Sequence, residues 1–332
     1  MNENEMSFAT VVVTYGSIGR FENLLKTIMS ALEGGAKKIY LIDNGCSYDL
    51  KNKILDKVDE GKIDIVELDK NYGSLVGFST GLQCALSDSL LKNSDYVLIL
   101  DDDVVLDKNF LKKFVVVERK WRSSGKHIWS LFREGRDQTV SNVADRNISY
   151  YQNSVAGFSI FRNKLNYTKR NNALGIPFFI PWAGTFLKKS ELSQIDLPAE
   201  PYFVYEDDAA FSLNARDKGF DIYRSYDLKL FESSNSWFEE DMTSQSGYKL
   251  FYDGHAYPGR FLYKVRNNIS LVNHRLITNK AKFIMNLVIF ILAGFVRYGR
   301  LNTNGFGRLW QLCSAVRDGL NDQLGENKSW KL

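Results

Sequence analysis

One stretch, from Tyr96 to Asp103, restricts the fold more than any other part of this 332-residue chain. It places Tyr-Val-Leu-Ile-Leu directly before three consecutive aspartates. A continuous apolar run of this length is typical of a strand buried on both faces of a parallel sheet. Ligands of such sheets bind at the carboxyl ends of the strands, where Asp101, Asp102 and Asp103 fall. Because adjacent carboxylates repel one another, the sequence predicts either a solvated turn or a site for a divalent cation and hydroxyl groups.

Strand-like and helix-like segments alternate before this run. The β-branched segment of residues 8–15 is followed by Gly16, and a second strand-like segment, residues 38–43, ends in Asp43. Apolar residues at helical spacing separate these segments. The alternation predicts an α/β fold with a mostly parallel sheet flanked by helices. Asp43 is then expected at the same edge of the sheet as the three aspartates.

A glycine-containing segment, residues 71–81, begins with Asn71-Tyr-Gly73 and precedes a predicted helix. Glycines let a backbone approach a ligand closely, and the start of a helix favours anions. The segment matches neither the phosphate-binding loop of nucleoside triphosphatases nor the dinucleotide-binding fingerprint. A plain loop therefore stays open as the alternative to a ligand-binding loop.

A second acidic group, Glu206-Asp207-Asp208, follows the aromatic segment Tyr202-Phe-Val-Tyr205. Acids in the first turn of a helix are favoured by its dipole, and apolar residues at helical spacing follow as far as Gly219. Capping explains one acid more easily than three. The sequence therefore also predicts that a carboxylate here serves as a general base.

Trp182 lies in a segment that contains two prolines, residues 175–187, and the pattern predicts a tight turn that leads into a strand. An aromatic ring at such a turn could stack on a sugar. A core tryptophan that fixes the turn is the equally weighted alternative, since tryptophan is usually largely buried.

The chain changes character after about residue 240, and we expect a helical C-terminal region over residues 241–332. Its most apolar run, residues 283–296, has Lys280 and Lys282 on one side and Arg297 and Arg300 on the other. The run is shorter than the roughly 20 residues that span a bilayer. The pattern favours either a buried core helix or an interfacial helix held by its basic flanks, in contact with a membrane or another subunit.

The overall charge and the cysteines indicate which partners and which cellular location to expect. A formal net charge of +4 is too small to argue for a nucleic-acid partner. Cys46, Cys84 and Cys313 are widely separated and lack metal-site or disulfide-framework spacing. The first residues lack the features of a signal peptide, so a reducing cytoplasm is the expected location.

Taken together, these motifs resemble those of inverting glycosyltransferases of family 2, whose GT-A fold is Rossmann-like. The resemblance covers about residues 1–240, which we expect to form the catalytic domain. The motifs that carry it are Val-Val-Thr14-Tyr15, Asp43-Asn44-Gly45, Asn71-x-Gly73 with Gly77-Phe78, Asp101-Asp102-Asp103, and Glu206-Asp207-Asp208 with Arg216 and Gly219. Within the family, the three aspartates and the Gly-Phe pair look most like bacterial galactofuranosyltransferases.

The resemblance implies a role for each motif. The residues expected to hold the nucleotide sugar are Thr14, Tyr15, Asp43, Asn71, Gly73, Asp101 and Asp102. The residues expected to hold Mn²⁺ or Mg²⁺ are Asp101, Asp103 and Glu232, and those expected to bind the acceptor are Trp182, Tyr205 and Glu206. Asp208, with Asp207 beside it, matches the family's catalytic base, which accepts the proton of the attacking hydroxyl in a single inverting displacement.

One position departs from the pattern of the galactofuranosyltransferases. They have a metal-binding histidine after the strand that follows the base, whereas the matching residue here is Glu232. Glutamate is a hard oxygen ligand, which favours Mg²⁺ or Mn²⁺ over softer ions. His255 is the alternative third ligand.

The expected function is transfer of galactofuranose from UDP-galactofuranose to a growing bacterial cell-surface glycan. The expected acceptor is lipid-linked, and the expected location is peripheral, on the cytoplasmic face of the cell membrane. A rhamnosyltransferase that uses dTDP-rhamnose is the close alternative. A nucleotidyltransferase and a non-catalytic glycan-binding protein account for fewer of the motifs, and the sequence leaves assembly into a homo-oligomer open.

Overall fold

The computed structural model describes residues 6–121, 125–134, 137, 148–161, 174–233, 247–253 and 258–332. The chain divides into two compact units. Unit 1 comprises Met1–Asp145, Tyr167–Pro198 and Phe211–Ser236, and unit 2 comprises Arg146–Asn166, Ala199–Ala210 and Trp237–Leu332. The predicted domain division at residue 240 stays a prediction. The compact units group residues 146–166 and 199–210 with the C-terminal part.

Unit 1 is built on one sheet with the strand order β3-β2-β1-β4-β8-β6-β9-β5, and β7 pairs with β9. The strands are β1 (Phe8–Gly16), β2 (Ala36–Cys46), β3 (Ile63–Leu68), β4 (Tyr96–Asp101), β5 (Val104–Leu106), β6 (His127–Arg133), β7 (Leu174–Gly175), β8 (Thr185–Lys188) and β9 (Asp221–Glu232). The pairs among β1, β2, β3 and β4 are parallel, as are β6 and β9. The remaining pairs are antiparallel. The predicted α/β class with a Rossmann-like sheet flanked by helices is confirmed, and the sheet is mixed because its parallel part, β3-β2-β1-β4, continues through antiparallel pairing with β8.

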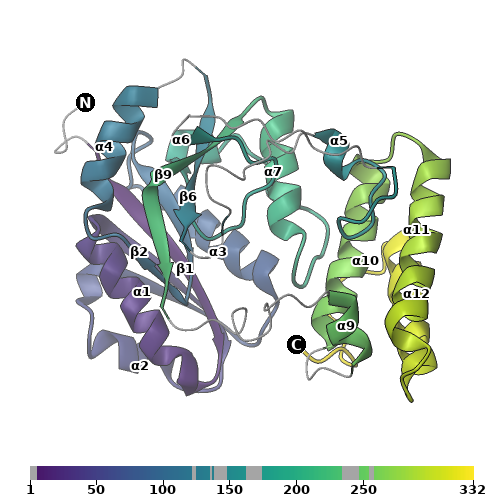
Figure 1. Ribbon diagram of the computed structural model, residues 1–332. Helices are drawn as coiled ribbons and strands as arrows, with labels where there is room; N and C mark the ends of the chain where they lie inside the picture. Colours follow the sequence, from purple (N-terminus) through teal and green to yellow (C-terminus); the bar gives the residue numbers. More distant parts are fainter. Residues whose placement is uncertain are drawn as a thin grey trace. The chain divides into compact units, whose positions relative to one another are not determined.

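Helices cover both faces of this sheet (Figure 1). Those that lie wholly in unit 1 are α1 (Phe21–Glu33), α2 (Leu50–Leu55), α3 (Ser74–Ser87), α4 (Phe110–Trp121) and α6 (Lys189–Leu192). Side chains alternate between the two faces along a strand, so Val11 and Val13 of β1 face α3, whereas Phe8 and Val12 belong to the core cluster that α1 and α4 also join.

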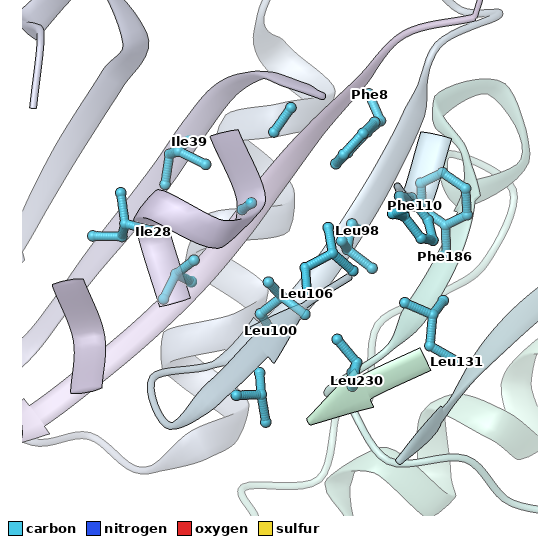
Figure 2. Packing of buried hydrophobic residues seen from close by; sticks show 14 of the residues in the cluster. Phe8, Ile28, Ile39, Leu98, Leu100, Leu106, Phe110, Leu131, Phe186 and Leu230 are labelled. Atoms are coloured by element: carbon cyan, nitrogen blue, oxygen red, sulfur yellow. The ribbon is translucent and has the colours of Figure 1, made fainter. Parts of the chain in front are cut away.

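The core cluster of unit 1 is aromatic at one end (Figure 2). The ring of Phe8 lies 5.3 Å from that of Phe110 and 5.7 Å from that of Phe186, in edge-to-face geometry. Leu98 and Leu100 of β4 are fully buried in the same cluster. The apolar run before the aspartates thus holds the centre of the sheet, and this fixes where its carboxyl end lies.

Two glycines of α3 allow this helix to pack closely on β1. A Cβ at Gly81 would lie 2.3 Å from Cγ1 of Val11, and one at Gly77 would lie 2.6 Å from Cγ1 of Val13. Only a residue without a side chain fits at either position. Gly77 and Gly81 therefore serve helix–sheet packing, and the ligand-binding interpretation of this segment applies to its first residues only.

Unit 2 is helical, and the predicted helical C-terminal region is confirmed. Its helices are α5 (Ile148–Tyr151), α9 (Gly247–Tyr252), α10 (Pro258–Arg275), α11 (Lys280–Gly294), the π-helix η5 (Phe295–Gly299) and α12 (Gly305–Leu320). α10 packs on α12, where Gly319 lets the helices approach: a Cβ there would lie 2.4 Å from the carbonyl oxygen of Arg266. The boundary between the two units falls within α7 (Asp207–Asp217), after Ala210.

Candidate functional site

The register of the parallel strands brings three of the predicted site residues to one edge of unit 1. Thr14 of β1 pairs with Asp43 of β2, and Val13 of β1 pairs with Asp101 of β4. Thr14, Asp43 and Asp101 therefore stand at the carboxyl ends of three neighbouring strands. Open α/β sheets bind their ligands at this edge.

Asp102 is buried, with 3% of its surface exposed, and is held by groups of the protein. The Thr14 hydroxyl donates to its Oδ2 at 2.6 Å, Arg20 Nε donates to the same oxygen at 2.9 Å, and Arg20 Nη2 donates to Oδ1. Arg20 also lies over the ring of Tyr15, 4.7 Å from its centroid. Asp102 thus fixes Arg20 beside Tyr15, and direct contact of Asp102 with a nucleotide stays a prediction.

The second and third motifs are tied together by Asn44. Its Nδ2 donates to the Gly73 carbonyl at 3.0 Å and to Asn71 Oδ1 at 3.3 Å, and its Oδ1 accepts from the Tyr72 amide at 3.0 Å. Asn71 Oδ1 also accepts from the Gly73 amide at 2.8 Å. The loop that begins at Asn71 is therefore positioned against the end of β2.

Close approach at Gly45 completes this junction. Gly45 has φ +81°, and a Cβ there would lie 2.4 Å from the backbone amide of Asn71. Asp43 Oδ1 accepts from the amide of Cys46 at 2.7 Å, which closes the turn after β2. The motifs at residues 43–45 and 71–73 are far apart in sequence and form one structural element at the sheet edge.

The predicted metal ligands lie on paired strands of unit 1 or directly beside them. β5 pairs with β9 so that Val104 lies opposite Glu232, and the Ser233 amide donates to the Asp103 carbonyl at 2.9 Å. Burial, together with the charges of Asp101, Asp102 and Glu232, raises the pKa of Asp103 to about 7. Negative charge at this point is therefore only partly compensated.

The compensating positive charge comes from Arg133, at the end of β6. Its Nη2 donates to Glu232 Oε1 at 2.9 Å, and its Nη1 lies 3.5 Å from Asp101 Oδ2. Its side chain is only 4% exposed. Burial lowers the pKa of Arg133, but Asp101 and Glu232 more than offset this effect and raise it above its ordinary value.

In the described part of the chain, no three His, Cys, Asp or Glu side chains are arranged as a metal-binding group. The chemistry of Asp101, Asp103 and Glu232 nevertheless fits a hard divalent cation, because all their donor atoms are carboxylate oxygens. The raised pKa of Asp103 marks charge that such a cation would offset. His255, the alternative ligand, lies outside the described residues.

The second acidic group lies in unit 2 on a strained loop. Tyr205 and Glu206 have φ values of +65° and +71°, which are uncommon for residues with a side chain. Asn267, which is fully buried in α10, holds this conformation: its Nδ2 donates to the carbonyls of Val204 at 2.8 Å and Tyr205 at 3.2 Å. Strain of this kind persists only where neighbouring groups enforce it.

Asn268 holds the side chain of Glu206. Its Nδ2 donates to Glu206 Oε2 at 3.1 Å, and its Oδ1 accepts from the Ala156 amide at 2.7 Å. Burial raises the pKa of Glu206 to about 7; the hydrogen bond from Asn268 and the charge of Lys264 oppose the rise, and Asp207 adds to it. The loop therefore carries a carboxyl group that can hold a proton near neutral pH.

Asp207 and Asp208 begin α7, where its dipole favours negative charge. Asp207 is buried, with 2% of its surface exposed, whereas Asp208 is half-buried and its Oδ1 accepts from the Ala209 amide at 2.8 Å. Of the two, Asp208 is the more accessible to a second molecule.

Trp182 is a core residue, which matches the alternative interpretation of this tryptophan. Its ring stacks on that of Phe78 at 5.3 Å and contacts that of Phe211 at 4.9 Å, and only 5% of its surface is exposed. This packing favours the core interpretation, and stacking of Trp182 on an acceptor sugar stays a prediction. Arg216, which belongs to the motif of the second acidic group, donates to the carbonyls of Phe178 and Pro177. It thereby fixes the chain that precedes the turn at Trp182.

Four residues that contribute to these two groups were not predicted: Arg20, Arg133, Asn267 and Asn268. Arg133 begins a polar stretch without a recognisable pattern, and its partners are 32 and 99 residues away. Of these four residues, Asn267 and Asn268 were the most recognisable from sequence. Two amides interrupt an amphipathic helix, and a polar residue at a buried helix position needs a specific partner.

Residues 10–192 match the family model of glycosyl transferase family 2, which is more than half of the chain. None of the curated proteins matches this chain significantly.

Among solved structures, S. aureus TarS is 13% identical with a TM-score of 0.45; the match covers 95% of this chain and 55% of TarS, so the chain spans about half its length. TarS 1–349 in complex with UDP is 14% identical with a TM-score of 0.47, over 96% of this chain and 91% of that one. GalNAc-T7 with UDP, GalNAc and Mn²⁺ is 15% identical with a TM-score of 0.46, over 70% and 44% of the two chains. On the match of residues 10–192, which contain the first four of the predicted motifs, the chain belongs to glycosyltransferase family 2.

Proposed function

We propose that this family 2 glycosyltransferase is an inverting, metal-dependent enzyme that transfers galactofuranose from UDP-galactofuranose to a growing bacterial cell-surface glycan. The observation that carries the proposal is the group of acids at the carboxyl edge of β1, β2 and β4, with Asp103 and Glu232 beside them. The choice of donor sugar rests only on the sequence resemblance that the three aspartates and the Gly77-Phe78 pair carry. The proposed acceptor is a lipid-linked glycan.

The residues of unit 1 would bind the donor. Thr14, Tyr15 and Asp43, at the carboxyl ends of β1 and β2, would contact the nucleoside, together with Asn71 and Gly73 on the adjoining loop. Arg20, fixed by Asp102, would face the nucleotide as a positive charge. Asp101, Asp103 and Glu232 would hold Mn²⁺ or Mg²⁺, which, when bound, supplies positive charge to the leaving diphosphate.

Asp208 would act as the base in unit 2. A carboxylate at the first turn of a helix is stabilised in its charged form, as proton acceptance from a hydroxyl requires. Glu206, with its pKa raised to about 7, is suited to hold a proton and would bind the acceptor together with Tyr205. The buried Asp207 would orient the loop.

The test is release of nucleoside diphosphate from a panel of nucleotide sugars, with and without EDTA. We expect release from UDP-galactofuranose that is lost in EDTA and restored by Mn²⁺ or Mg²⁺. Release from dTDP-rhamnose alone would contradict the donor assignment and identify a rhamnosyltransferase. Pyrophosphate release from a nucleoside triphosphate would indicate a nucleotidyltransferase, and glycan binding without turnover would indicate a binding protein.

A further inference from the structure

The helix α11 and the π-helix η5 that continues it carry an exposed apolar stripe. Ile284, Met285, Val288, Leu292 and Val296 follow one another at intervals of one, three or four residues, which places them on one side of the helix. Each is between 47% and 57% exposed. A surface helix ordinarily carries polar residues on the side that faces away from the core.

The opposite side of α11 is firmly fixed within unit 2, so the stripe is not a sign of a misplaced helix. Phe283, Leu287 and Phe290 are buried there. Asn286, also buried, donates to the Asn153 carbonyl at 2.7 Å and accepts from the Ile160 amide at 2.9 Å. The helix therefore has one side packed in protein and one apolar side that is about half exposed.

The apolar surface extends to α12, which runs alongside α11 (Figure 1). Phe306 and Trp310, one helical turn apart, are 74% and 76% exposed. The ring of Phe306 lies 5.0 Å from that of Phe295, which directly precedes Val296 of the stripe. We call the five stripe residues together with Phe306 and Trp310 the apolar face.

The charges around the apolar face have one sign. From Leu276 to Val316 the sequence contains no Asp or Glu and five basic residues: Lys280, Lys282, Arg297, Arg300 and Arg308. The next two residues, Arg317 and Asp318, form an ion pair with each other. A partner that offers an apolar interior beneath a negatively charged surface complements both features. An anionic lipid bilayer has this composition.

We propose that the apolar face docks unit 2 on the surface of an anionic lipid bilayer, with α11 lying in the plane of the interface. The segment Lys280–Gly299 has 20 residues and, by length and composition alone, is apolar enough to cross a membrane. Because the side that carries Phe283, Leu287 and Phe290 is packed in protein, an in-plane position fits the structure better. This docking goes beyond the proposed sugar transfer and does not depend on it.

The test is cosedimentation of the full chain with vesicles of phosphatidylglycerol and phosphatidylcholine, and with phosphatidylcholine alone, at low salt. We expect binding to the anionic vesicles and much weaker binding to the neutral ones. The double variant Val288→Ser/Leu292→Ser should lower the partition coefficient by about tenfold, because it removes apolar area from the docked surface. Lys280→Gln/Lys282→Gln should also lower it by roughly tenfold.

Matched controls lie in unit 1. Leu90 and Val116 are also exposed apolar residues, at 82% and 63%, and Lys51 and Lys57 are exposed basic residues. Leu90→Ser/Val116→Ser and Lys51→Gln/Lys57→Gln should leave the partition coefficient unchanged. Brominated lipids should quench a tryptophan signal that is absent in Trp310→Phe, a measurement that does not depend on the serine variants.

Three results would overturn the proposal. The protein could stay in the supernatant with anionic vesicles, or the control pairs could reduce binding as much as the test pairs. The third is a lipid-free dimer in sedimentation velocity that Val288→Ser/Leu292→Ser dissociates, since the apolar face would then be a subunit interface. Loss of sugar transfer in a soluble assay would bear on the proposed function and leave this result unaffected.

Discussion

The two acidic groups of this protein are held by different chemistry. In unit 1, Asp102 and Glu232 accept hydrogen bonds from the guanidinium groups of Arg20 and Arg133. In unit 2, Glu206 accepts from the neutral amide of Asn268. A guanidinium compensates negative charge, whereas an amide supplies only a dipole.

Each group contains one carboxyl with a raised pKa, but the causes of the rise differ. Asp103 has a pKa of about 7 because it is buried among three other acids, so a bound cation would lower it. Glu206 reaches a similar value mainly through burial, with only Asp207 adding to the rise. The first group thus concentrates negative charge that guanidinium groups offset in part, whereas the second contains a buried carboxyl that can hold a proton near pH 7.

The largest effect expected from the second group is on turnover. Asp208→Asn keeps the shape of the side chain and removes its ability to accept a proton, so kcat should fall by roughly 10²–10⁴. Donor affinity, measured by calorimetry, should be unchanged.

Asp207→Asn is the matched variant, since the buried Asp207 is expected to orient the loop and not to react. It should reduce kcat much less, in line with loss of a helix-capping interaction of about 1 kcal/mol. A larger loss in Asp207→Asn, or normal turnover in Asp208→Asn, would place the base elsewhere and make Glu206 the next candidate.

The second expected effect is a pH dependence of stability due to Glu206. Its pKa of about 7 in the folded protein is above its ordinary 4.5, so the folded state binds the proton more tightly. The stabilisation is complete below about pH 4.5 and is lost as the pH rises toward 7, by at most about 3 kcal/mol.

The measurement is urea unfolding of wild type and Glu206→Gln at several values between pH 5 and 7.5. The wild-type free energy of unfolding should decrease over this range more steeply than that of the variant. Glu326→Gln, at an exposed position of unit 2, should retain the wild-type slope. Parallel profiles for wild type and Glu206→Gln would mean that the loop does not perturb this carboxyl.

A third, smaller effect tests whether neutral amides hold the strained loop. Asn267→Ala leaves the buried carbonyls of Val204 and Tyr205 without this donor and should reduce the free energy of unfolding by about 2 kcal/mol. Asn273→Ala, at an exposed position of the same helix, is the control and should have little effect. Equal effects of the two substitutions would show that Asn267 does not support the loop.

The smallest effect concerns the charged support of the first group. Arg20→Lys keeps the charge but cannot form the paired hydrogen bonds to Asp102 or lie flat over Tyr15. We expect a loss of about 1 kcal/mol in thermal unfolding experiments. Arg119→Lys, at an exposed position of α4, should leave the stability unchanged. A comparable loss in this control would show that the effect of Arg20→Lys is not due to the Arg20–Asp102 pair.

The strands that could be predicted from the sequence are those whose own residues form a recognisable pattern. The segments at residues 8–15, 38–43 and 96–101 became β1, β2 and β4 because each combines β-branched or apolar residues with an abrupt polar or glycine end. The positions of β8 and β9 in the sheet were not predicted. Their position depends on pairing with distant strands, which no local pattern specifies.

The same distinction applies to the site. The acids were found because they follow strands, and strand register then brought Asp43 and Asp101 to one edge. Arg20 was missed because its partner, Asp102, is 82 residues away. For Trp182 the sequence left a core role and a sugar-stacking role open, because a sequence does not show which rings pack on it, as Phe78 and Phe211 do here.

The central claim is that the acids of unit 1 bind a divalent cation together with a nucleoside diphosphate. Calorimetric titration of UDP at pH 8 tests it most directly, with Mn²⁺ or EDTA, for wild type and Asp103→Asn. We predict that Mn²⁺ strengthens UDP binding to wild type by at least about tenfold, equivalent to about 1.4 kcal/mol, and that Asp103→Asn loses this gain while keeping the affinity measured in EDTA. Equal affinity of wild type in Mn²⁺ and in EDTA would contradict the claim.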